Sequence, residues 1–186
     1  KTEPDETMNG RSIRYPRGKT LGGSSSINGL LYIRGQSQDY DVWRQMGNSG
    51  WGWEDVLPYF IKAENQERGK DDYHGVGGPL SVSDQRIQLP LLNEFQNAAA
   101  EFGIPKTKEI KTGDNYGCGY IKKKEKDGFR CSTAVGYLNP IKRRENLKII
   151  TNAHVKKINF ENKTAKEVEY WQESELKKIS AQREII

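Results

Sequence analysis

The sequence predicts a mixed fold of helices and strands, in the α/β or α+β class. Apolar side chains recur at helical spacing in two stretches, within residues 56–61 and 91–102, whereas they alternate with polar ones in the last third of the chain. Four Trp, nine Tyr and five Phe among 186 residues supply the apolar anchors that disordered chains lack. Because only 34% of the residues are hydrophobic and 30% are charged, we do not expect a large self-contained core.

The first half of the chain is expected to hold two helices and a short strand after a long loop. Residues 15–35 predict a loop rich in Gly and Ser whose apolar end starts a helix. A second helix is expected over residues 54–61, with Pro58 in its first turns, where a missing N–H does least harm. Residues 79–83 alternate as a short strand does.

Two helices are expected further along. Residues 90–102 place their apolar side chains on one stripe, and Gly103 is suited to end that helix as a C-terminal cap. Ser132 can cap a helix that continues through Leu138 and ends before Pro140.

The last third of the chain predicts strands. They are expected at 147–151, 155–160 and 167–171, and a polar turn at residues 162–163 separates the second from the third. Residues 183–186 read as the start of a further strand. A strand interrupted in this way indicates a fragment of a longer protein.

The basic charge of the chain is spread over clusters that also hold acidic residues. The net charge is +5, and Lys or Arg residues gather at 122–124, 142–144, 156–157 and 177–178. We interpret these clusters as solvated faces and expect no nucleic-acid partner, a polyanion site being the weaker alternative.

The two cysteines, Cys118 and Cys131, do not have the spacing of a CxxC motif. Free thiols are the favoured interpretation, with one disulfide left open. The sequence shows neither an apolar run as long as a membrane span nor a signal-peptide pattern, which means little for a chain that opens without Met.

The most informative stretch is 15–35, YPRGKTLGGSSSINGLLYIRG. Gly22 and Gly23 remove side chains where backbone must approach something closely, and three Ser hydroxyls follow beside backbone N–H groups. Such an arrangement suits an anion or a pyrophosphate. The stretch is neither a Walker loop nor a GxGxxG fingerprint. From the residues alone, a plain Gly-Ser linker is therefore at least as well supported as an anion site.

This stretch resembles the first signature of the glucose-methanol-choline (GMC) flavoprotein oxidoreductases. Every element of that signature has a counterpart here: Gly18, Lys19, Leu21, Gly22, Gly23, Ser24, Ser25, Ile27, Asn28, Tyr32, Gly35 and Asp41. Further segments, among them YHGVGGPLSV and RCSTAVGYLNP, are similar in order to the choline-dehydrogenase-like branch of that family. The resemblance covers nearly the whole chain.

The resemblance implies a set of cofactor-binding residues. Those expected to line the flavin and its pyrophosphate are Gly22, Gly23, Ser24, Asn28 and Gly29, with Leu31 near the isoalloxazine ring and the backbone of Val155 against the adenine. Some members bond the flavin covalently through a His at the position that Asn28 occupies. An amide cannot form that bond, so non-covalent FAD is expected, whereas Asn28 without a cofactor would be a helix-start amide. Arg130 and Ser132 are expected to support the site from outside it.

The resemblance also implies how the chain is divided. Residues 1–66 would belong to the FAD-binding domain, 67–128 to a substrate-binding domain, and 129–186 to the FAD-binding domain again. The dinucleotide fingerprint of the family would lie upstream of this chain and its catalytic His downstream. We therefore expect no catalytic residue and no metal site in this chain, and assign no chemistry to His74 or His154.

The function implied is oxidation of an alcohol CH–OH group by hydride transfer to flavin. Its partners would be a small-molecule alcohol and an electron acceptor, either oxygen, a quinone or another acceptor. A lyase on the same flavin scaffold and a non-enzymatic basic binding module are the alternatives. The expected location is the cytoplasm or, with membrane association left open, a peripheral membrane site.

Overall fold

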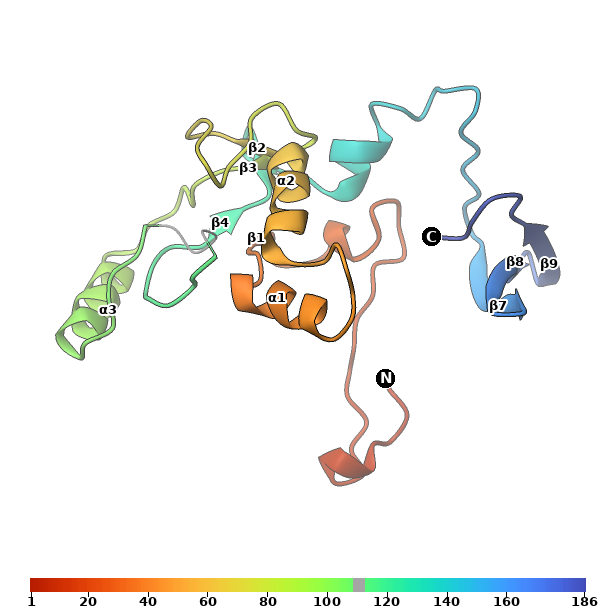
Figure 1. Cartoon of the computed structure of the whole chain (residues 1–186), viewed down its shortest axis with the longest axis horizontal. Coiled ribbons are helices and arrows are strands. Elements are labelled where there is room, and N and C mark those ends of the chain that lie inside the picture. The colour runs from red at the N-terminus through yellow and green to blue at the C-terminus, as the bar shows by residue number, and fades with distance from the viewer. Residues whose placement is uncertain (109–112) are drawn as a thin grey trace. The chain divides into compact units, whose positions relative to one another are not determined.

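The computed structural model describes residues 1–108 and 113–186, and the chain divides into two compact units, residues 1–141 and 142–186. Helices and short strand pairs make up the first unit, and an antiparallel sheet forms the second (Figure 1). This mixture confirms the predicted class. The three predicted domain segments concern a longer protein, and they stay a prediction.

The first unit is built from short elements. Its helices are η1 (Glu6–Met8) and η2 (Gly23–Ser26), both 3₁₀, then α1 (Ser37–Gln45), α2 (Trp53–Ala63), α3 (Pro90–Glu101) and the single π-turn η3 (Ala134–Leu138). Its strands are β1 (Leu31–Tyr32), β2 (Glu64–Gln66), β3 (Leu80–Val82), β4 (Lys122–Lys123), β5 (Glu125–Lys126) and β6 (Phe129–Arg130). β1 pairs with β4 and β5 with β6 in antiparallel fashion, and β2 pairs with β3 in parallel.

Acidic side chains start the two helices α1 and α2. Asp39 accepts a hydrogen bond from the backbone N–H of Gln36 at 2.8 Å, and Asp55 accepts one from Gly52 at 3.0 Å. Each carboxylate thereby satisfies an N–H that the helix leaves without a partner. The predicted helix around Pro58 is confirmed as α2, where that residue stands sixth of 11.

Aromatic rings join α1 to α2. The ring of Tyr40 lies 5.4 Å from that of Trp43, 5.6 Å from that of Trp53 and 5.7 Å from that of Phe60, and Trp51 packs on Trp43 at 6.0 Å. Pairs at these separations stabilise a contact beyond the area they bury. The tryptophans of this Gly-rich segment are therefore packing anchors.

The interior of the first unit is mostly polar. Among the described residues, Val82 and Cys131 are the buried hydrophobic side chains. Beside them, buried Arg34 forms an ion pair of 2.6 Å with buried Glu64 and donates to the carbonyl of Tyr73 at 2.7 Å. Removing either partner of such a pair would leave an uncompensated buried charge, which is strongly destabilising.

The second unit is a three-stranded antiparallel sheet of β7 (His154–Glu161), β8 (Thr164–Gln172) and β9 (Glu175–Ser180). Both hairpin turns have positive φ at their two central residues, 47° and 67° at Asn162 and Lys163 and 52° and 64° at Glu173 and Ser174. That is the backbone of a type I′ turn, whose twist matches the strands. The predicted turn at 162–163 is confirmed.

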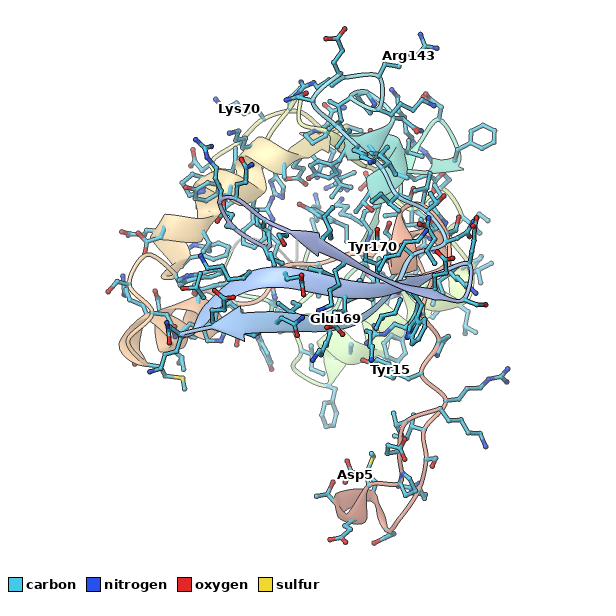
Figure 2. The ribbon with its side chains drawn as sticks, turned by 90° about the vertical axis from the view of Figure 1, so that its right-hand side faces the viewer. Asp5, Tyr15, Lys70, Arg143, Glu169 and Tyr170 are labelled. Carbon is cyan, nitrogen blue, oxygen red and sulfur yellow. The ribbon has the colours of Figure 1, made fainter. Side chains whose placement is uncertain are left out.

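The two faces of this sheet differ in chemistry. Ile158, Val168 and Ile179 are cross-strand partners on one face, whereas Glu169 and its neighbour Tyr170, labelled in Figure 2, point to opposite faces because strand side chains alternate. Asn159 donates to the carboxylates of Glu167 and Glu169 at 2.8 and 3.0 Å. One face is thus apolar and the other carries a network of charges.

Several predicted elements were wrong. Residues 147–151 and 183–186 form no strand, because an apolar run becomes a strand only where a partner completes its hydrogen-bond ladder. The apolar end of 15–35 starts no helix, since its backbone pairs as β1 with β4. By contrast, the helix expected over 132–138 is confirmed as the π-helix η3, which begins two residues later at Ala134 and ends at Leu138 as expected.

Candidate functional site

The Gly-Gly-Ser stretch folds into a compact turn, residues 18–31, which we call the cofactor turn. Within it the N–H of Gly23 donates to the carbonyl of Thr20 at 2.9 Å, and Asn28 donates to Ser24 at 3.0 Å. The hydroxyl of Ser24 accepts from the N–H of Gly18 at 3.2 Å, which closes the turn. Gly22 and Gly23 take positive φ of 89° and 53°, as a left-handed bend requires.

Three of the four glycines of the turn, Gly18, Gly22 and Gly23, have different surroundings. A Cβ on Gly18 would lie 2.1 Å from the carbonyl oxygen of Gly23, and a Cβ on Gly22 would lie 2.5 Å from the hydroxyl of Ser26 and 3.1 Å from that of Ser132. A Cβ on Gly23 would meet nothing within 4 Å. The turn is therefore packed on one side and faces open space on the other, which is what close approach of a dinucleotide to backbone needs.

Asn28 sits at the end of η2 and does not start a helix. Its Oδ1 accepts hydrogen bonds from the N–H of Leu30 at 3.1 Å and from Nη1 of Arg130 at 3.0 Å. Leu30 itself has a φ of +67°, a strained value for a branched residue. Its carbonyl accepts from the N–H of Lys124 at 2.9 Å, so bonds on both sides hold the bend.

A second segment, residues 130–134, binds the cofactor turn from behind. Arg130 donates to the carbonyls of Ser25 at 3.0 Å and Asn28 at 2.8 Å. The N–H of Thr133 donates to Ser25 Oγ at 2.9 Å, and its hydroxyl donates to the carbonyl of Gly22 at 3.2 Å. The structure thus brings the expected support Arg130 against the turn, and adds Thr133, which the sequence did not single out.

The remaining predicted site residues lie as follows. Gly29 is exposed beside Leu30, and Leu31 is 53% exposed in β1 opposite Lys123. Val155 belongs to the second unit, where it is 57% exposed in β7 opposite Tyr170. All predicted cofactor-binding residues except Val155 therefore lie in the cofactor turn.

Other groups with chemical potential are engaged in the fold. His74 is buried, and its Nδ1 lies 2.7 Å from a carboxylate oxygen of Asp71. Partial burial opposes ionisation of Asp71, but the hydrogen bonds from His74 and nearby backbone outweigh it and lower the pKa of that carboxyl. We assign this pair a structural role.

One basic cluster was misjudged. Lys122 is buried and contacts Asp84, which also binds Arg68 at 2.8 Å, so its part of the cluster 122–124 is not a solvated face. Burial favours the uncharged form of Asp84 and so opposes ionisation. The hydrogen bonds and positive charges of Lys122 and Arg68 outweigh burial and lower the pKa of that carboxyl. Cys118 and Cys131 are free thiols, as favoured.

Away from the turn, an open hollow of about 370 Å³ is lined by Gly35, Asp39, Tyr40, Val42 and Trp43. It includes no residue of the cofactor turn. Residues 1–108 and 113–186 contain no cluster of His, Cys, Asp and Glu able to hold a metal ion. No described helix is both long and apolar enough to cross a membrane.

Comparison with known proteins decides what this arrangement belongs to. The profile described as GMC oxidoreductase matches residues 5–186. The chain belongs to the GMC oxidoreductase family. It is 40% identical over its whole length to an oxygen-dependent choline dehydrogenase of Vibrio vulnificus, covering 33% of that protein. It is 41% identical, over 93% of its length and 32% of the relative, to an alcohol dehydrogenase [acceptor] of Pseudomonas putida.

Solved GMC-type structures share the fold of this chain. An FAD-dependent oxidoreductase from Chaetomium thermophilum aligns with a TM-score of 0.85 and 28% identity, over 97% of this chain and 34% of that one. The chain therefore spans about a third of the length of the relatives it matches. The expected family resemblance is confirmed.

Proposed function

We propose that this GMC chain is the flavin-binding segment of a longer FAD-dependent enzyme that oxidises an alcohol. The observation that carries the proposal is the cofactor turn, whose glycine backbone faces open space at Gly23 while Arg130 and Thr133 hold it from behind. The names of the relatives, a choline dehydrogenase and an alcohol dehydrogenase, support the reaction class. The Chaetomium thermophilum structure, named FAD-dependent, supports the cofactor.

The chain's own residues would bind and orient FAD. The backbone of Gly22, Gly23 and Gly29, with the hydroxyl of Ser24, suits a pyrophosphate, since short residues let anions approach N–H groups. Leu31, half-exposed in β1, would contact the isoalloxazine ring, and Val155 the adenine. Bound FAD supplies the hydride acceptor for the alcohol carbon. The proton of the hydroxyl would go to a base that this chain does not provide.

Non-covalent attachment is part of the proposal. Residues 18–31 contain no His, Cys or Tyr that could form a bond to the flavin ring, and Asn28 is an amide. Acid precipitation of the intact enzyme should therefore release the yellow chromophore into the supernatant. Flavin that stays in the protein pellet would contradict this part of the proposal.

The main test uses the intact protein that contains this chain. We expect it to purify with a flavin absorption spectrum and to reduce an artificial dye when an alcohol such as choline is added. Oxygen uptake measured beside dye reduction would identify the favoured acceptor. A colourless protein would overturn flavin binding, whereas a flavin-loaded protein inert toward choline and a panel of primary and secondary alcohols would overturn alcohol oxidation alone.

A further inference from the structure

Arg130 makes an unusual set of contacts for a surface-proximal arginine. It lies in β6 opposite Glu125, yet its Nη1 reaches three oxygens of the cofactor turn: the carbonyls of Ser25 and Asn28 and the Oδ1 of Asn28, at 3.0, 2.8 and 3.0 Å. Charge-assisted bonds of this kind are about twice as strong as neutral ones. The two N–H groups of Nη1 are shared among these three oxygens, all of which belong to residues 25–28 of the turn.

These bonds determine which way the amide of Asn28 faces. Two donors, Nη1 of Arg130 and the N–H of Leu30, point at its Oδ1. A flipped amide would place its NH₂ group against both donors, so the observed orientation is the only one the surroundings allow. The NH₂ group is consequently the polar end that Asn28 can offer to a ligand of the turn.

We infer that Arg130 is a positioning residue that locks Asn28 with its amide NH₂ group presented as a hydrogen-bond donor to the flavin. The inference rests on the proposed function, because it needs a flavin at the turn. In this inference Asn28 donates the hydrogen bond to the flavin. Arg130 fixes the orientation of the Asn28 amide and does not itself contact the cofactor. Lysine at this position would keep the charge, but its side chain is one bond shorter than the path to Nη1, from which all three contacts are made.

Thr133 makes the inference testable without loss of fold. Its two bonds to Ser25 and Gly22 hold the same turn independently of the guanidinium. Arg130→Lys should therefore leave the turn in place while freeing the amide of Asn28 to rotate. Asn28→Asp is a second test. Its carboxylate still accepts hydrogen bonds from Arg130 and Leu30, but it has no N–H group to donate to the flavin.

The experiment measures the dissociation constant, absorption spectrum and midpoint potential of FAD in the intact enzyme. We expect Arg130→Lys to weaken FAD binding about tenfold, the size of one lost charge-assisted bond, and to alter the flavin spectrum. Asn28→Asp should lower the midpoint potential, because a negative charge beside the ring disfavours the reduced anion. In an Asn28→Ala background, Arg130→Lys should change affinity less than twofold, since the two residues act through one contact.

Arg86→Lys is the matched control, because Arg86 is exposed and forms an ion pair of 2.6 Å with the surface residue Glu67, outside the cofactor turn. It should change none of the flavin readouts. If Arg130→Lys lowers the melting temperature but leaves affinity, spectrum and potential unchanged, Arg130 is merely structural and the inference falls. Absence of flavin from the unsubstituted enzyme would overturn the proposed function, and this inference with it.

Discussion

At the scale of single residues, the glycines of the cofactor turn separate folding from binding. Gly18→Ala would push a methyl group to 2.1 Å from a backbone carbonyl, so we expect it to destabilise the intact enzyme by about 1–3 kcal/mol or more and to lose flavin as a consequence. The strain falls on backbone, which cannot move aside as a flexible side chain can. Urea unfolding of the flavin-free protein measures this cost.

Gly23→Val is the contrasting substitution. Its side chain would enter the open space beside the turn, so the cost to folding should be limited to the positive φ, about 1–2 kcal/mol. Flavin occupancy should nevertheless fall sharply, because that space is where we place the cofactor. The flavin-to-protein absorbance ratio and urea unfolding on the same preparation separate the two effects. Full occupancy in Gly23→Val would show that the turn is a linker.

Residue-level sequence reasoning found the turn and, through the family resemblance, the support Arg130, but it missed Thr133. Gly22, Gly23 and Asn28 stand in a contiguous motif that a family resemblance can identify. The bonds from Arg130 and Thr133 cross 102 to 111 positions of the chain, and no local pattern reports a contact at that separation. The need for Gly18 likewise arises from the approach of Gly23, which only the folded turn shows.

At the scale of elements, the hairpin between β7 and β8 can be improved. Lys163 adopts a φ of +67°, which costs energy for any residue with a Cβ. Lys163→Gly would create the Asn-Gly pair that type I′ turns prefer, and should stabilise the second unit by about 0.5–1 kcal/mol. The urea concentration at the midpoint of unfolding should rise. Lys166→Gly inside β8 is the control and should lower it, because glycine weakens a strand interior.

The charged face of the same sheet predicts acid sensitivity. The hydrogen bond from Asn159 and then the Lys178 ammonium lower the pKa of Glu167, and Asn159 does the same for Glu169. Carboxyls with a depressed folded pKa stabilise the fold above their unfolded pKa of about 4.5, and lose that contribution as pH falls through the folded value.

The melting temperature should therefore drop as pH falls below about 4.5. Asn159→Ala should reduce the slope of that fall, while Glu161→Gln on the same strand should leave it intact. A slope unaffected by Asn159→Ala would show that the network contributes nothing to stability.

Helices and strands could be predicted from the sequence where their own apolar residues recur at a helical or strand spacing. α2, α3 and the β7–β8 hairpin show apolar spacing or a polar turn that is legible in the sequence. Two-residue strands such as β4 show no period, since pairing with a distant partner alone defines them. Residues 147–151 have the composition of a strand and lack the partner.

At the scale of the whole molecule, exposed apolar side chains predict that the 186-residue chain is a poor independent folding unit. On α3 and its cap, Leu91, Phe95 and Phe102 are 76, 66 and 87% exposed. Such surfaces promote association unless another part of a protein covers them. Expressed alone, the chain should self-associate, bind a hydrophobic dye and unfold without a sharp transition.

Adding excess FAD and an alcohol to this isolated chain should give no dye reduction, because we expect the catalytic base to lie outside these 186 residues. Leu91→Gln with Phe95→Gln should reduce self-association, while Lys108→Gln should not. A cooperative thermal transition together with alcohol-dependent turnover would contradict this prediction and would require a catalytic group among the residues we treat as structural.

The separation between the cofactor turn and its clamp also has a consequence during synthesis. Asn28 leaves the ribosome 102 residues ahead of Arg130, and at about 5–20 residues per second that distance takes roughly 5–20 s to translate. Throughout that interval the nascent turn lacks the guanidinium that orders it. Ordering of the turn by Arg130 therefore begins only after that interval, and a pause in translation between these two residues would delay it by the length of the pause.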